Sequence, residues 1–119
     1  MKMVNGFLVF IAAVFMMVGL FAADVRAEKK VGVLLWTEEA RYSESQKGII
    51  DQMKKDGLGE PEVKFITEHA AGNKAKAVEI ANKFSAAKVD MIIALGTTAA
   101  AIAAKDIKDI PIIFSMVYD

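Results

Sequence analysis

The chain has 119 residues and no cysteine, and its 15 basic and 15 acidic residues give a formal net charge of zero. The lack of cysteine excludes a disulfide-based fold and any cysteine-ligated metal site, and no block of basic residues points to nucleic-acid binding. The hydrophobic fraction of 55% exceeds the ~45–50% that is usual for globular chains. Much of this excess lies at the N-terminus.

The first predicted element is a secretory signal peptide over residues 1–27. The uncharged apolar run Phe7–Ala23 follows a basic N-terminus, and Val25 and Ala27 are small residues at the two positions that a signal peptidase reads. We therefore expect cleavage after Ala27, export to the periplasm and a mature segment of residues 28–119. Retention of the apolar run as a membrane tether is the alternative, because its length is at the short edge of the ~17–25 residues that span a bilayer.

Strands and helices alternate along the mature segment. A continuous apolar run predicts a first strand that is buried on both faces, and a shorter alternating run predicts a second strand nearer an edge. In chain order, the expected elements are strand Lys30–Trp36, a helix from about Ser43 to Asp56, strand Val63–Thr67, a helix opened by Asn73, strand Met91–Leu95, helix Thr98–Lys105 and strand Pro111–Val117.

The two longer helices are predicted from caps and periodicity. Ser43 and Gln46 have the spacing of a capping box, and the helix they would open is expected to bury Ile49, Ile50 and Met53. Behind Asn73, one helical face collects apolar residues at i, i+3, i+4 and i+7, namely Ala77, Ile80, Ala81 and Phe84. Both helices are therefore expected to pack on a sheet.

This order of elements predicts an α/β fold of flavodoxin-like type, with right-handed βαβ units and a parallel sheet. In open sheets of this kind, ligands bind beyond the carboxyl ends of the strands, at the point where the strand order reverses. The segments expected at that edge are Thr37–Ser45, Glu68–Asn73, Gly96–Thr98 and Tyr118–Asp119.

The turn Gly96–Thr98 is the most specific candidate for a binding site. Free backbone amides at a helix start, together with the helix dipole, favour an anion such as a carboxylate, and the hydroxyls of Thr97 and Thr98 would add donors without charge. Alternatively, Thr97 only caps the helix while Gly96 lets the chain turn. The spacing matches no nucleotide-binding motif.

Other candidates for chemistry are few. His69 is the single histidine and lies in a polar loop, and Glu38 with Glu39 would be an acid–base pair only if the two carboxylates met. Trp36 and Tyr42 flank the first loop, where aromatic rings could stack on a ligand or belong to the core. No constellation indicates an enzyme, a metal site or a cofactor.

Several segments together resemble a known family. The stretches KVGVLLW, AAGNKAKAVEIANKFSAAKVDMIIALGTTAAAIA and DIPIIFSMVYD are similar to the N-terminal lobe of periplasmic substrate-binding proteins of ABC transporters, in the group related to tryptophan and tyrosine uptake. The resemblance covers Lys30 to Asp119. Its most specific part is Ile110–Asp119, which fits the family strand I-P-I-[VI]-F-x-x-V-x-D.

The resemblance implies a two-lobed protein that closes on a small solute, often an amino acid, and delivers it to an ABC permease in the membrane. Thr97 and Thr98 match the family position that holds the ligand carboxylate, and Asp119 matches an aspartate facing the interlobe cleft. Two loops depart from the family pattern. Glu38–Ser43 replaces E-H-P-A-L-D, and His69–Gly72 replaces N-A-Q-G.

The resemblance also implies that residues 28–119 are only the front part of the first lobe. Two other classes remain as alternatives. One is a membrane-tethered sensory domain, which would retain the apolar leader. The other is a flavodoxin-like single-domain enzyme or receiver, although a receiver needs acidic residues where Trp36-Thr37 and Gly96-Thr97 stand.

Overall fold

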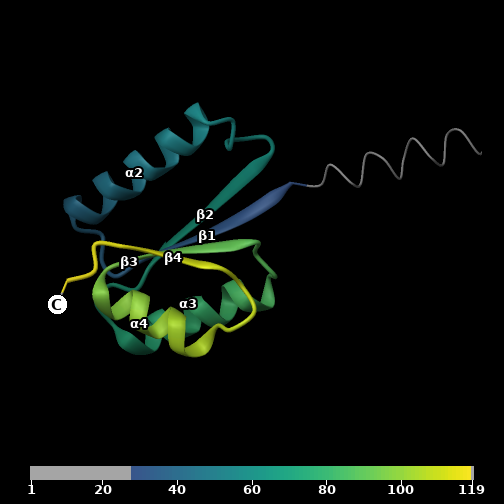
Figure 1. The fold of residues 1–119 in the computed structure, drawn as a ribbon. Coiled ribbons are helices and arrows are strands. Elements are labelled where there is room, and N and C mark those ends of the chain that lie inside the picture. The colour runs from purple at the N-terminus through teal and green to yellow at the C-terminus, as the bar shows by residue number, and fades with distance from the viewer. Residues whose placement is uncertain (1–27, 119) are drawn as a thin grey trace, which may run out of the picture.

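A computed structural model describes residues 28–118, so the expected signal peptide and Asp119 lie outside the described residues. Strands and helices alternate as predicted (Figure 1): β1 (Lys29–Leu35), α2 (Ala40–Lys55), β2 (Val63–His69), α3 (Lys74–Ala86), β3 (Met91–Leu95), α4 (Thr97–Asp106) and β4 (Ile112–Ser115). Within this part of the chain, no helix is both long and apolar enough to cross a membrane.

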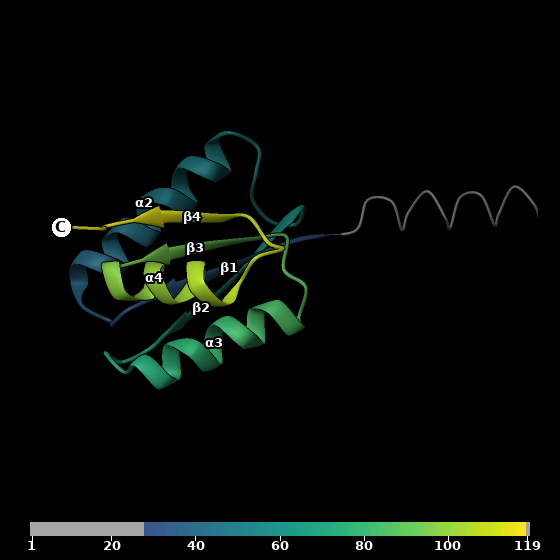
Figure 2. The same cartoon turned by 60° about the horizontal axis from the view of Figure 1, so that its bottom comes forward.

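The strands form one parallel sheet in the order β2-β1-β3-β4 (Figure 2). From β1 the chain moves outward to β2, then returns past β1 to β3 and continues to β4 on the other side. The strand order therefore reverses between β1 and β3. This confirms the predicted parallel α/β fold and its switch point.

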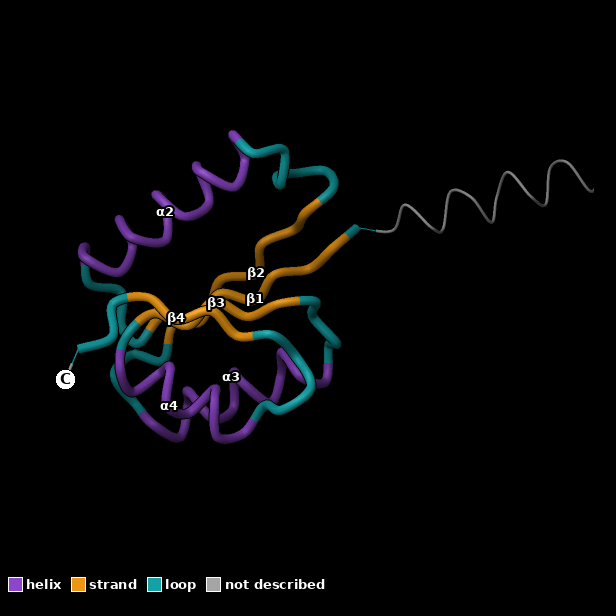
Figure 3. The backbone as a smooth tube through the Cα atoms, in the orientation of Figure 1, coloured by secondary structure: helices purple, strands orange, loops and turns teal. Residues whose placement is uncertain are grey.

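The helices form a layer on each side of the sheet (Figure 3): α2 lies on one face, and α3 and α4 lie on the other. Alternate β1 residues divide between the two layers, since Val33 and Leu35 belong to the α2 cluster while Leu34 packs with α3. All residues from Val31 to Leu35 are buried, which confirms that this strand is covered on both faces.

Small residues bring α3 and α4 close to the sheet. A Cβ added at Gly32 of β1 would lie 2.7–2.9 Å from the Phe84 ring of α3, so the glycine makes room for that ring. On α4 the buried residues are all alanines, Ala99, Ala100 and Ala103. The predicted face of α3 is confirmed, and Asn73 caps this helix by accepting a hydrogen bond of 3.1 Å from the Lys76 amide.

The predicted start of α2 is wrong. The helix begins at Ala40 with Glu39 as its N-cap, so Ser43 is inside the helix and makes no capping box. Gln46 instead donates its side-chain amide to Thr67 of β2 at 2.6 Å. The buried residue of α2 is Tyr42, which is 5% exposed and lies in the first turn of the helix, ahead of the predicted start.

Two further expectations need correction. Ile49, Ile50 and Met53 are only half-buried, because α2 contacts mainly β1 and leaves one side of these residues uncovered. The last strand is also shorter than Pro111–Val117. It ends at Ser115, since Met116 adopts a φ of 57°, a left-handed conformation that breaks the strand.

Candidate functional site

The carboxyl ends of β1, β3 and β4 are joined at one edge of the sheet by backbone hydrogen bonds. The Trp36 amide donates to the Leu95 carbonyl at 3.1 Å, and the Gly96 amide donates to the Ser115 carbonyl at 3.0 Å. The segments that follow these three strands are therefore neighbours at the switch point, where the fold predicts a ligand.

Gly96 makes a turn that no other residue fits well. Its φ is 108°, and an added Cβ would lie 2.9 Å from Trp36 Cβ and 3.3 Å from Tyr42 Cε1. Trp36 is half-buried and Tyr42 is buried, so both predicted aromatics close around the turn from the β1 side. The burial of Tyr42 leaves little of its ring for a ligand, and a direct contact from either aromatic stays a prediction.

The helix start behind Gly96 has open amides. Gly96 is the N-cap of α4 and provides no side-chain cap, and the first helical bond runs from the Ala100 amide to the Gly96 carbonyl at 2.9 Å. The amides of Thr97, Thr98 and Ala99 precede this bond, and no hydrogen bond among residues 28–118 takes them. Unpaired amides at the positive end of a helix dipole are the arrangement that favours a nearby anion.

The two threonines of the turn have different surroundings. The Thr97 hydroxyl accepts the Tyr118 amide at 2.9 Å and donates to the Tyr118 carbonyl at 3.3 Å. Thr97 therefore does not cap α4, and the simple capping alternative is wrong for this residue. Thr98 is half-buried, and its hydroxyl has no hydrogen-bond partner within residues 28–118. A ligand role for either hydroxyl stays a prediction.

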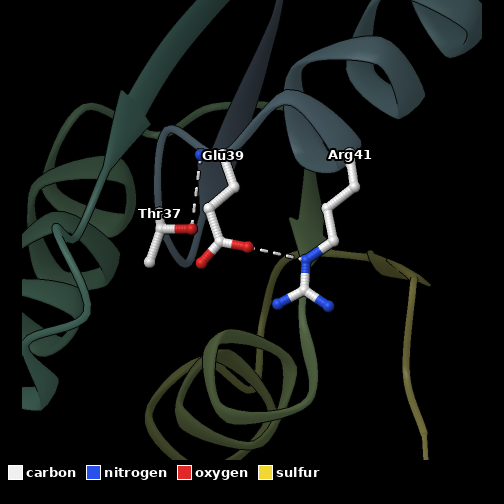
Figure 4. A network of polar contacts seen from close by, with 3 residues as sticks. All are labelled: Thr37, Glu39 and Arg41. Carbon is white, nitrogen blue, oxygen red and sulfur yellow. Dashed lines mark hydrogen bonds and ion pairs between the residues drawn. The ribbon is translucent and has the colours of Figure 1, made fainter.

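The first loop is organised by ion pairs (Figure 4). Glu39 contacts Arg41 at 2.9 Å, and its amide donates to Thr37 Oγ1 at 3.4 Å. Glu38 contacts His69 Nε2 at 3.3 Å, which joins the loops after β1 and β2. The adjacent glutamates thus go to separate partners at the surface, and the structure does not bring them together as an acid–base pair.

The remaining expectations about the site concern Asp119 and metals. Asp119 lies just outside the described residues, so its ligand contact is still a prediction. In the described part of the chain, no group of three or more histidine, aspartate or glutamate side chains is arranged to hold a metal ion. The contact between Thr97 and Tyr118 was missed by sequence reasoning, because no local signal relates two residues 21 positions apart.

A parallel α/β lobe with open amides beside its switch point is the architecture in which small solutes are commonly bound beyond the carboxyl ends of the strands. The sequence model for the family "ABC transporter substrate binding protein" matches residues 30–119. The chain belongs to this family, which confirms the resemblance seen in the sequence.

Several relatives are similar over most of the described chain. The tyrosine-binding protein of Clostridioides difficile (strain R20291) is 30% identical over 97 residues, which are 81% of this chain and 28% of that protein. A ligand-free, open structure of a Clostridium difficile substrate-binding protein with adhesive properties has a TM-score of 0.72 and 29% identity, and covers 76% of this chain and 31% of that one.

A third relative was solved with a ligand. The structure of an ABC domain in complex with L-Trp, from Streptococcus pneumonia, has a TM-score of 0.74 and 26% identity, and covers 78% of this chain and 32% of that one. The chain thus spans less than a third of the length of each of these relatives. Two of these relatives are described as binding proteins, and the third was solved in complex with L-Trp.

Proposed function

We propose that the chain is the front part of the first lobe of an extracytoplasmic solute-binding protein of an ABC importer. The solute would bind in a cleft between two lobes and pass to the ABC permease in the membrane, with no cofactor. The observation that carries the proposal is the set of open amides at the start of α4, in a family with a relative solved in complex with L-Trp.

The proposed solute is an amino acid with an aromatic side chain, because one relative is named a tyrosine-binding protein and another was solved in complex with L-Trp. Its carboxylate would accept the amides of the first turn of α4 and the Thr98 hydroxyl, where the helix dipole favours negative charge. Asp119 follows Tyr118 directly and would place a carboxylate near the ammonium group. The half-buried Trp36 ring, beside Gly96, would contact the apolar part of the ligand.

Calorimetric titration tests the binding function. The gene is read on past Asp119, the longer product is purified, and L-tyrosine and L-tryptophan are titrated in turn. We expect a second α/β lobe and saturable one-to-one binding of at least one of these amino acids. Residues 28–119 alone should show no measurable affinity, because half of the cleft is missing. A downstream sequence with no second lobe, or a folded two-lobed protein that binds neither amino acid, would contradict the proposal.

Export is the second part of the proposal. Because Val25 and Ala27 supply small residues at the cleavage positions, the mature N-terminus is expected at Glu28. Mass spectrometry of the exported protein measures this end directly. An intact N-terminus on membrane-bound material would favour the tethered sensory domain instead.

A further inference from the structure

The chain changes direction immediately after β4. The last ladder contact of this strand is the hydrogen bond from the Gly96 amide to Ser115, and Met116 then turns with a φ of 57°. This turn brings Tyr118 to the start of α4, where its amide and carbonyl both meet the Thr97 hydroxyl. The segment 116–118 therefore lies beside the open amides of α4.

The hydroxyl of Thr97 has no hydrogen left for a ligand. A threonine hydroxyl donates one hydrogen bond and accepts up to two. In the structure the hydrogen goes to the Tyr118 carbonyl at 3.3 Å, while the oxygen accepts the Tyr118 amide at 2.9 Å. Thr98 differs, because its hydroxyl makes no hydrogen bond in the described chain and can still donate one.

We infer that Thr97 is a positioning residue, whose hydroxyl fixes the backbone of Tyr118 against the start of α4 and so sets one wall of the ligand site. The inference rests on the function proposed above and assigns the two threonines different tasks: Thr98 contacts the solute, and Thr97 places the backbone of Tyr118.

Because the segment after β4 is exposed, we expect the single hydroxyl of Thr97 to have a large effect on the position of Tyr118. Met116 packs against the core cluster that contains Tyr42, but Val117 is 49% exposed and Tyr118 is 63% exposed, so little apolar packing holds these last two residues within the described chain. The only hydrogen bonds of Tyr118 in the described chain are the two that it shares with the Thr97 hydroxyl, one donated by the Tyr118 amide and one accepted by the Tyr118 carbonyl. Removal of this hydroxyl should therefore free the backbone of Tyr118 from the start of α4.

The test compares three variants of the longer, two-lobed product. Thr97→Val keeps the shape of the side chain but removes the hydroxyl, Thr97→Ser restores a hydroxyl, and Thr98→Val is the matched control one residue along. Two quantities are measured on folded protein: the affinity for L-tyrosine and L-tryptophan by calorimetry, and the hydrogen-exchange protection of the Tyr118 amide. Melting temperatures are recorded in parallel, since a purely structural role would lower them and leave the affinity unchanged.

We expect Thr97→Val to lose about fivefold in both Tyr118 protection and ligand affinity, the size of one neutral hydrogen bond. Thr97→Ser should restore both. Thr98→Val should weaken ligand binding while the Tyr118 amide stays protected.

Two results would overturn the inference. Wild-type affinity in Thr97→Val, with Thr98→Val impaired, would leave the proposed function intact and remove the role of Thr97. Weakened binding in Thr97→Val with unchanged Tyr118 protection would make Thr97 a direct ligand donor. If the unsubstituted protein binds neither amino acid, the proposed function fails. In that case, loss of Tyr118 amide protection in Thr97→Val but not in Thr98→Val would still show that the contact between Thr97 and Tyr118 exists.

Discussion

The two edges of the sheet are built from different residues. On the β2 edge, Thr67 accepts a hydrogen bond from Gln46 of α2, and Glu68 contacts Lys83 of α3 at 2.9 Å. On the β4 edge, Ile113 and Phe114 are each 50% exposed, and no charged residue occurs from Ile110 to Tyr118. Within residues 28–118, one edge is thus polar and tied to both helix layers, while the other is apolar and uncovered.

The two edges therefore differ in two properties: protection against pairing with other chains, and nearness to the proposed ligand site. Charged and polar side chains keep an edge strand from pairing with other chains, and β2 has them on its own surface. The β4 edge lacks that protection, yet the segment that follows it adjoins the open amides of α4. We therefore expect the β4 side to depend on further contacts for its solubility and to contribute most of the ligand contacts. The β2 side should remain soluble without such contacts and contribute little to the ligand site.

The largest expected effect is on self-association. Residues 28–119 alone should form assemblies through β4, because an exposed apolar strand is a template for pairing. Ile113→Lys places a charge on this edge and should shift the protein to monomer in sedimentation velocity at about micromolar concentration. Leu58→Lys is the matched control: Leu58 is 49% exposed but lies after α2, away from the edge, so the assemblies should persist.

A monomeric parent with a sharp two-state melt would contradict this expectation. It would show that β4 closes the sheet without help, and that the contrast between the two edges has no effect on solubility. Equal rescue by both lysine substitutions would attribute the association to general surface hydrophobicity instead of the edge.

The next effect concerns the ligand. In the two-lobed protein, Thr98→Val should weaken amino-acid binding by about 1.5–3 kcal/mol, or roughly ten- to a hundredfold, as for other hydrogen bonds to a charged group. Thr67→Val is the matched substitution on the β2 edge and should change the affinity less than about twofold. Calorimetry on both variants gives the comparison. Equal losses would mean that the site is not confined to the β4 side.

The smallest expected effect is on the free energy of unfolding, through an ion pair on the β2 edge. Lys83→Met removes the ion pair with Glu68, whose second carboxylate oxygen is buried without a partner in the described chain. Because such pairs are partly solvated, we expect a loss of only about 0.2–1 kcal/mol. Urea unfolding of residues 28–119 with Ile113→Lys measures it, and Lys76→Met, an exposed position on the same helix, is the control. Equal midpoints for the two variants would show that this contact does not strengthen the edge.

Those features of the fold that depend on local burial could be predicted from the sequence. The continuous run over Val31–Leu35 correctly indicated a strand covered on both faces, and Asn73 correctly marked the start of α3. The start of α2 could not be found in this way. It depends on Tyr42 packing beside Gly96, a contact between segments far apart in the chain, whereas the capping-box spacing of Ser43 and Gln46 was only a local coincidence.

For the candidate site as well, the general location could be predicted from the sequence but the long-range contacts could not. Its location follows from strand order, since Trp36 and Gly96 end the two strands beside the switch point. The different hydrogen-bond partners of Thr97 and Thr98 were not predictable, because adjacent identical residues carry the same local signal. Only the path of the chain at Tyr118 distinguishes them. The roles of these threonines and of Asp119 toward a ligand remain predictions.

The alanines of α4 limit which parts of the proposed site can change in related proteins. Ala99 and Ala100 occupy the first turn of the helix, and both are buried against the sheet, at 0% and 5% exposure. The turn whose amides we propose to bind the carboxylate is therefore packed tightly against the sheet, and a larger side chain there would displace the helix together with its amides. Solute preference should accordingly vary through the surrounding loops, while the recognition of a carboxylate stays constant among descendants of this lobe.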